Sequence, residues 1–449
     1  MAISRNAKQP LVREKRQLGL LAAIAVVTGE SIALGIFLTP AAMAKSLGSP
    51  LLLCLVWLGM AVMAASGALC YSELAVHYPE SGGEYVYLQA GYGPQTAFLY
   101  GWMSTIVMYP GVAAALAVAS VAYVLQLMPL GSLAQSLVPV VLLCAFALVN
   151  LLGTRMGGAI MSFVNILKLV LLFSLGAWAI LSGHAHVANL LPLAVRRPGS
   201  DALFPAVAGA VVSAFFSFGG WWEAGKIAGE IRNPRRTLPL AFFFGIAVVT
   251  AVYLLISVAF LAVVPIERVT SNTAFVAQFG ESLFGTSGAH VLSICVLICV
   301  CGGIAALTMA APRVSYAMAH TGSFFSTFGK LHTRFGTPAN AILLQTVLAL
   351  AVLLLGAFDR MLAYIIFSAV LFLALTVSTL FRMPEPVRGW WFPAAPIVFI
   401  VCCATVAGLI LMHDPLPALV GTAIVLCGIP AHKMLKSRQP ELPLTSKRS

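Results

Sequence analysis

The chain has 449 residues, of which 60% are hydrophobic and only 9% are charged. A soluble protein of this length needs many more charged and polar residues on its surface, so the composition excludes an ordinary globular domain. The formal net charge of +12 does not indicate nucleic-acid binding, because Lys and Arg stand between apolar stretches and do not cluster with aromatic residues. We therefore expect a protein that spans a membrane.

Long apolar stretches follow one another along the chain. A spanning helix needs about 20 apolar residues, and we find about twelve stretches of that order. The expected spans cover residues 18–44, 50–72, 96–128, 134–152, 157–182, 203–225, 238–264, 288–318, 340–357, 361–381, 393–412 and 416–432. The expected fold class is an all-α membrane protein with tails at residues 1–17 and 433–449.

The distribution of Lys and Arg predicts how the spans are oriented. Most of these 26 residues, including Lys226 and Arg313, fall in the tails or in connections that the spans place on the same side. The opposite side receives only Lys45, Arg196, Arg197, Arg268 and Arg360. Because positive charge collects on the cytoplasmic side, we expect both termini in the cytoplasm and an even number of spans.

Two of the expected spans contain residues that a continuous helix does not favour. Residues 28–37 read TGESIALGIF, and residues 217–223 read SFGGWWE. Glycine costs about 1 kcal/mol in a helix interior, and unwound backbone is tolerated at membrane depth where it faces a cavity. Breaks in the first and sixth spans are typical of transporters built from two inverted repeats, here 18–182 and 203–381, with two further helices at 393–432. The alternative is that these glycines only allow close helix packing.

Lys168 lies inside the fifth expected span among apolar residues. A mid-membrane ammonium costs at least about 2.5 kcal/mol, so this side chain should face the bundle interior. The carbonyl groups freed by the first break are its expected partners, and there it could replace a sodium ion or lose its proton when the site closes. The alternative is that Lys168 extends to the cytoplasmic interface.

Two carboxylates fall at the breaks. Buried carboxylates tend to be protonated unless they are paired. Glu30 is expected to carry a proton, to act as counter-ion to a positively charged substrate, or to form an ion pair with Lys168. Glu223 lies close to Lys226 and to the expected cytoplasmic exit, where a solvated or ion-paired position is an equal alternative to a functional role.

Four stretches resemble a known family. Residues 71–87, YSELAVHYPESGGEYVY, resemble the ELxxxxPxSGGxYxY signature of the amino acid-polyamine-organocation superfamily. Residues 228–239, AGEIRNPRRTLP, resemble its AGExxNPxRxxP loop, and 313–319 (RVSYAMA) and 335–341 (FGTPANA) match two further elements. The resemblance is to bacterial L-type or serine/threonine-exchanger-like amino acid permeases and covers roughly residues 17–432.

The resemblance implies a LeuT-like fold of two five-helix repeats followed by two extra helices. It also implies that Lys168 stands where many members carry a fifth-helix lysine in place of sodium. The chain departs from the family at the first break, where Ala33-Leu34-Gly35 replaces the usual Gly-Ser-Gly. Because the sixth break also differs, the resemblance does not indicate which substrate is chosen.

The function that the resemblance implies is sodium-independent secondary transport of amino acids across a bacterial inner membrane, by proton symport or exchange. Cationic amino acids or polyamines are the alternative substrates. An enzyme or receptor would need a cluster of His, Asp or Cys at membrane depth, and a channel would need a repeated pore ring. The sequence shows neither, so we expect no enzyme, cofactor or metal. The expected partners are the substrate, membrane lipid and protons, without nucleic acid, for a monomer or homodimer.

The substrate site is expected near the bilayer midplane, between the two breaks. The N–H groups that begin a half-helix can hold a carboxylate, so the amides of residues 33–35 should bind that of the substrate. The amino group should bind the carbonyls of Phe216, Ser217 and Gly219. The predicted substrate-binding residues are Gly29, Glu30, Ser31, Ala33, Leu34, Gly35, Phe216, Ser217, Phe218, Gly219 and Trp221, with Glu30 and Lys168 as coupling residues.

Overall fold

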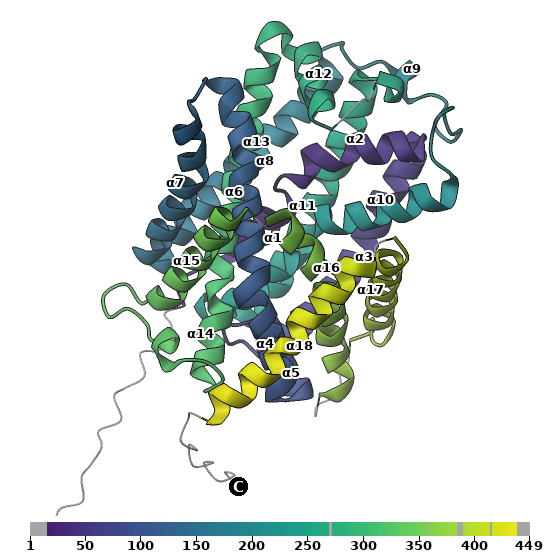
Figure 1. The fold of residues 1–449 in the computed structure, drawn as a ribbon. Coiled ribbons are helices and arrows are strands. Elements are labelled where there is room, and N and C mark those ends of the chain that lie inside the picture. Colours follow the sequence, from purple (N-terminus) through teal and green to yellow (C-terminus); the bar gives the residue numbers. More distant parts are fainter. Residues whose placement is uncertain (1–15, 269–271, 357, 384–388, 414, 438–449) are drawn as a thin grey trace, which may run out of the picture.

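The computed structural model describes residues 16–268, 272–356, 358–383, 389–413 and 415–437. The outer parts of the two expected tails, residues 1–15 and 438–449, lie outside these ranges. The regular elements within them are helices (Figure 1).

The first half of the chain contains the first broken span. Its elements are α1 (Leu20–Ser31), α2 (Gly35–Leu47), α3 (Pro50–His77), α4 (Glu84–Tyr92), α5 (Pro94–Met103), η1 (Ser104–Met108), α6 (Tyr109–Leu127), α7 (Ser132–Leu151), α8 (Thr154–Leu181) and α9 (Val187–Leu190).

The second half contains the other broken span. Its elements are α10 (Leu203–Phe218), η2 (Trp221–Glu230), α11 (Pro234–Val263), η3 (Ile266–Arg268), α12 (Asn272–Phe284), η4 (Gly285–Ser287), α13 (Gly288–Ala310), α14 (Pro312–His320), η5 (Ser326–Gly329), α15 (Ala339–Leu355), α16 (Phe358–Ser378), η6 (Thr379–Arg382), α17 (Ala394–His413) and α18 (Pro415–Ser437).

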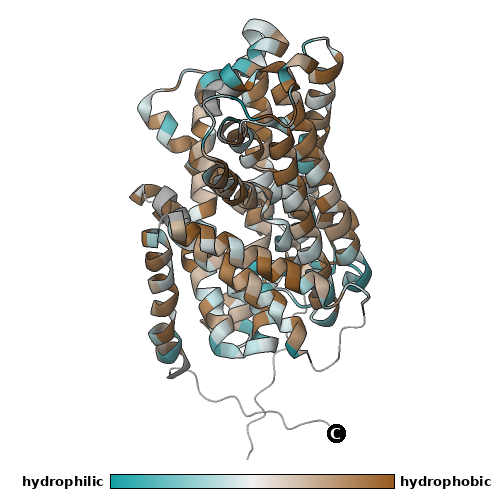
Figure 2. Ribbon diagram, turned by 90° about the vertical axis from the view of Figure 1, so that its right-hand side faces the viewer, coloured by the Kyte–Doolittle hydropathy of each residue, from teal (hydrophilic) through white to brown (hydrophobic). Residues whose placement is uncertain are grey.

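The helices are long and apolar enough for a membrane protein. Within the described ranges, nine helical segments can cross a membrane, and α1 with α2 form a tenth that bends by 43°. Ala339–Leu355 and Ile366–Arg382 are shorter apolar segments, and together these correspond in order to the expected spans. Hydrophobic residues cover the bundle, while hydrophilic residues gather toward its two ends (Figure 2). The expected all-α membrane fold is confirmed.

Both expected breaks are present. Helix α1 ends at Ser31 and α2 begins at Gly35, which leaves residues 32–34 outside regular helix. Helix α10 ends at Phe218, and a 3₁₀ helix, η2, begins only after two glycines. Gly220 has a φ of 95°, in the left-handed region that glycine adopts without steric cost. The second break therefore lies at its two glycines, whereas the first lies at residues 32–34, between Gly29 inside α1 and Gly35 at the start of α2.

The packing brings the two breaks together. Helix α2 lies against α10, and α1 lies against η2 and α11 (Figure 1). Helices α9 and α12 lie at one end of the bundle, and α4, α5 and α14 lie at the other. The two broken spans thus meet in the interior, away from both ends.

Candidate functional site

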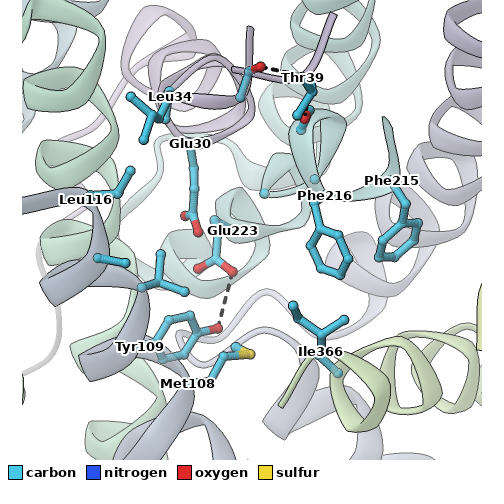
Figure 3. Close-up of a pocket in the computed structure, with 18 of the residues that line it drawn as sticks. Glu30, Leu34, Thr39, Met108, Tyr109, Leu116, Phe215, Phe216, Glu223 and Ile366 are labelled. Atoms are coloured by element: carbon cyan, nitrogen blue, oxygen red, sulfur yellow. Dashed lines mark hydrogen bonds between the residues drawn. The ribbon is translucent and has the colours of Figure 1, made fainter. Parts of the chain in front are cut away.

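A cavity of about 650 Å³ lies between the two breaks. Its walls come from α1, α2, α6, α10, η2 and α16, and Figure 3 shows several of the side chains that face it. Most of the lining is apolar, for example Leu34, Leu116 and Phe216, and a few polar groups, including Glu30 and Glu223, face the same space. A volume of this size and such a lining are typical of small-molecule sites.

The structure brings most of the predicted substrate-binding residues to this cavity. Those that line it are Glu30, Ala33, Leu34, Gly35, Phe216, Ser217 and Gly219. Gly35 begins α2, so the first N–H groups of that half-helix have no partner within the helix and point into the break. A helix start of this kind favours a bound anion.

The other four predicted residues, Gly29, Ser31, Phe218 and Trp221, do not line the cavity. Successive helical residues point in different directions, and these four turn toward neighbouring helices. A Cβ added to Gly29 would come within 2.7 Å of the Cβ of Ala306, so this glycine allows close packing. The buried Trp221 ring packs on Tyr71, with 5.3 Å between ring centroids.

Lys168, on α8, caps the first break. Its ammonium donates hydrogen bonds to the carbonyl oxygens of Thr28 (3.0 Å), Gly29 (3.0 Å) and Ile32 (2.8 Å). The side chain is fully buried, so it does not extend to the membrane interface. The contact expected from the sequence is therefore present. The Thr28 carbonyl also accepts the Ile32 N–H, while Lys168 is the donor to the carbonyls of Gly29 and Ile32, which the end of α1 leaves without helical partners.

Glu30 does not pair with Lys168. Its Oε2 atom is buried and has no hydrogen-bond partner within the described part of the chain. The carboxylate instead points toward Glu223 across the cavity (Figure 3). Of the three roles considered for Glu30, the ion pair with Lys168 is not the arrangement in this structure.

Glu223 and Lys226 belong to a buried charged cluster. Lys226 Nζ lies 2.6 Å from Glu223 Oε1 and 2.9 Å from Glu84 Oε2. The Tyr109 hydroxyl donates to Glu223 Oε1 over 3.2 Å (Figure 3). All of these side chains are buried. Lys226, which was expected among the solvent-facing cytoplasmic charges, is thus an interior cation, and Glu223 is ion-paired rather than solvated.

Sequence reasoning missed two residues of this region. Glu84 was visible only as one letter of the SGGEYVY stretch, and its pairing with Lys226 joins positions 142 residues apart. Tyr253, within the apolar α11, donates to the carbonyl of Ser31 over 3.0 Å and also contacts that of Ser217. This hydroxyl links the two breaks, and no local pattern around it indicates that role.

A second buried ion pair joins η2 to α14, at the end of the bundle that carries α14. Arg313, on α14, donates to both carboxylate oxygens of Glu230, each over 3.0 Å. The backbone N–H of Leu18 donates to the Glu230 carbonyl, and that of Arg232 donates to the Leu18 carbonyl. Arg313 was also expected to face the cytoplasm, but its side chain is buried in this contact.

Gly35→Ala is expected to disturb the meeting point of the breaks. The added Cβ would lie 2.8 Å from the Cβ of Ser217 and 2.9 Å from its Cα, so α2 or α10 must shift. Overpacking of this kind costs about 1–3 kcal/mol. We expect a lower thermal unfolding midpoint in detergent and loss of ligand binding. Gly59→Ala, where no atom lies within 4 Å, is the control. If Gly35→Ala keeps the wild-type unfolding midpoint and ligand binding, α2 and α10 can move apart at the breaks without cost.

The comparisons with known proteins agree with one another and cover nearly the whole chain. The family model described as "Amino acid permease" matches residues 18–427. The serine/threonine exchanger SteT of Bacillus subtilis (strain 168) is 28% identical over 95% of this chain and 98% of that protein. The human cystine/glutamate transporter is 26% identical over 94% of this chain and 86% of its own length. The rat large neutral amino acids transporter small subunit 2 is 28% identical over 93% and 80%, respectively.

The family match includes both breaks, the lysine that caps the first one and almost all of the described helices. It agrees with the resemblance found in the sequence motifs and with the LeuT-like class, whose first and sixth helices are broken. We conclude that this chain belongs to the amino acid permease family of the amino acid-polyamine-organocation superfamily.

Proposed function

We propose that this protein is a sodium-independent secondary transporter that carries amino acids across the membrane by alternating access, through exchange or proton symport. The observation that carries the proposal is the position of Lys168. Carbonyl oxygens at unwound helices are the groups that coordinate sodium in transporters of this architecture. Here the ammonium already satisfies three of them, from Thr28, Gly29 and Ile32.

The geometry of the cavity supports an amino acid as substrate. The start of α2 offers free N–H groups to a carboxylate. The carbonyl of Phe216 at the end of α10 accepts a bond from the Gly219 N–H but retains a second lone pair for an ammonium. The relatives are named as an exchanger of serine and threonine and as transporters of cystine, glutamate and large neutral amino acids.

The closed end of the bundle supports alternating access. The Glu230–Arg313 pair and the Leu18 contacts seal the end that carries α14, while the cavity lies between the breaks. Opening toward that end requires these contacts to separate. We place this end in the cytoplasm of a bacterial cell. We also propose that the chain consists of two repeats, at 18–182 and 203–381, followed by two additional helices at 393–432.

Uptake by the purified protein in proteoliposomes is expected to be unchanged when sodium is replaced by potassium or choline at constant pH. The physical reason is that the Lys168 ammonium occupies the carbonyl groups at the first break. Uptake should saturate with substrate and accelerate when unlabelled substrate is loaded inside. A fall in uptake on sodium removal would show that the coupling ion is sodium and that Lys168 does not replace it.

The substrate can be identified by thermal unfolding of the protein with individual amino acids and small polyamines. A ligand that binds only the folded state raises the unfolding midpoint by mass action. At least one amino acid should do so. A screen in which polyamines stabilise the protein and amino acids do not would favour the alternative substrate class.

A further inference from the structure

The cavity contains two carboxylates that face each other. Glu30 comes from α1 and Glu223 from η2, and both line the cavity (Figure 3). In the described part of the chain, the Oε2 atom of each is buried without a hydrogen-bond partner. The Glu223 side chain is 1% exposed. Buried polar atoms are almost always satisfied, so two unpartnered acceptors aimed at one space indicate a missing donor.

The groups around this pair carry too little positive charge to balance the carboxylates. Lys226 contacts both Glu84 and Glu223, so one ammonium already serves two carboxylates. With these three groups ionised, the cluster carries one net negative charge, and an ionised Glu30 would add another. Like charges this close are not both stable in a buried site unless a proton or another cation lies between them.

The groups near Glu30 that could donate a proton to it are already engaged. Its charged neighbours are Glu223, Lys226 and Glu84, and the further donors in this region are Lys168, Tyr109 and Tyr253. The Lys168 ammonium bonds to backbone carbonyls, and Tyr253 bonds to the carbonyl of Ser31. The Tyr109 hydroxyl donates to Oε1 of Glu223, not to Oε2. Within the described residues, none of these groups donates to Oε2 of Glu30.

We propose that the Glu30–Glu223 pair holds a proton when the cavity is empty and exchanges that proton for a cationic group of the substrate. The group is an ammonium or guanidinium other than an α-amino group. In the exchange, the carboxylic proton leaves to solvent and the substrate cation takes its place, so the net charge of the site is the same before and after binding. The proposal rests on the proposed transport of amino acids and narrows it to cationic ones.

The walls of the cavity fit the rest of such a substrate. Leu34, Leu116 and Ile366 give apolar surface to the cavity that the two carboxylates line, with Ile366 on the opposite side from Leu116 (Figure 3). An unbranched methylene chain can contact these side chains while its charged end reaches the carboxylates. Lysine combines such a chain with a terminal ammonium and with the carboxylate that the start of α2 can bind. Lysine is therefore the probe, and norleucine, which has no terminal amine, is its neutral counterpart.

The test is calorimetric titration of the purified full-length protein with lysine, norleucine and cadaverine. Each titration is repeated in two buffers with different ionisation enthalpies, across about pH 5 to 8. The difference between the two buffers gives the number of protons released. We expect lysine binding to release about one proton over part of this range and to weaken as the pH falls there, because protons compete for the pair. Norleucine should release none.

Glu30→Gln tests the assignment to this pair. The amide keeps the shape of the side chain but neither titrates nor attracts a cation. Proton release should disappear, and lysine should bind about 10- to 100-fold more weakly, the range for loss of a charged hydrogen bond. Norleucine binding should be retained, which also shows that the variant is folded. Glu281→Gln, at an exposed position on α12 outside the cavity, is the matched control and should behave as wild type.

The possible results separate this proposal from the proposed function. If lysine and norleucine bind alike and neither releases a proton, the cation site is wrong and amino acid transport stands. Lysine binding with proton release that persists in Glu30→Gln would also overturn the assignment. If cadaverine binds with proton release and neither amino acid binds, the cation site stands and amino acid transport is wrong. If none of the three binds, both proposals are wrong.

Discussion

Lys168→Met is expected to abolish uptake and to destabilise the protein by about 3 kcal/mol or more. The substitution leaves the carbonyls of Thr28, Gly29 and Ile32 without their common donor. The Thr28 carbonyl keeps its bond from the Ile32 N–H, so those of Gly29 and Ile32 are left unsatisfied. Each buried polar group of this kind costs about 1–3 kcal/mol. The first break would then lose the contact that holds it to α8. Thermal unfolding in detergent and uptake in proteoliposomes measure the two effects separately.

Lys45→Met is the matched control, because Lys45 lies on the same broken span but is exposed on α2. It should leave both stability and uptake close to the wild-type values, since exposed charges contribute little. Wild-type uptake by Lys168→Met would mean that the ammonium neither supports the break nor takes part in the cycle. Stability that is restored by sodium in Lys168→Ala would show that the same carbonyl groups can coordinate the ion.

Lys226→Met is expected to destabilise the protein by about 3–5 kcal/mol. The ammonium lies 2.6 Å from Glu223 and 2.9 Å from Glu84, and all three side chains are buried. Removing one partner of a buried ion pair leaves an uncompensated charge, which is why the cost is large. Here two carboxylates lose their cation together. The thermal unfolding midpoint of the purified variant should fall accordingly, and uptake should be lost.

The origin of this effect can be tested with second-site changes. Adding Glu84→Gln and Glu223→Gln to Lys226→Met removes the charges that the single substitution leaves unpaired. Replacing a whole buried ionic group by neutral side chains is often close to neutral in stability. The triple variant should therefore recover most of the lost stability. A triple variant as unstable as the single one would show that packing of the Lys226 chain, rather than charge, is responsible.

Several features followed from local sequence alone. The composition and the lengths of the apolar stretches predicted a helical membrane protein because the bilayer sets the length of a span. The glycines at residues 29 and 35 and at residues 219–220 predicted both breaks, because a helix interior disfavours them at adjacent turns. The partners of Lys168 were also predictable, since a buried ammonium needs oxygen ligands and the first break offers free carbonyls.

The assignment of individual side chains to the cavity was less complete. Trp221 and Gly29 lie beside lining residues in sequence but face other helices, because one residue along a helix turns the side chain by about 100°. The sequence positions of residues near a break do not indicate which way each side chain points when the helix changes to a 3₁₀ form, as it does after Gly220. The lining could therefore be predicted as a segment but not residue by residue.

Membrane class, helical composition and the two breaks are thus local properties of this chain, set by hydrophobic length and by glycine. The charged cluster is not local: Glu84, Glu223 and Lys226 come from two elements, and their pairing depends on the contact between the start of α4 and η2. The sequence counted Lys226 among the cytoplasmic charges and allowed an ion pair with Glu223, but it did not indicate burial, because the positive-inside rule counts Lys and Arg without knowing which are buried. Tertiary packing buried the Lys226 ammonium in an ion-paired cluster, and it left Glu30 facing Glu223, with the Oε2 atom of Glu30 unpartnered among the described residues. Packing decides this because the energy of a buried charge depends on groups brought near it from distant parts of the chain.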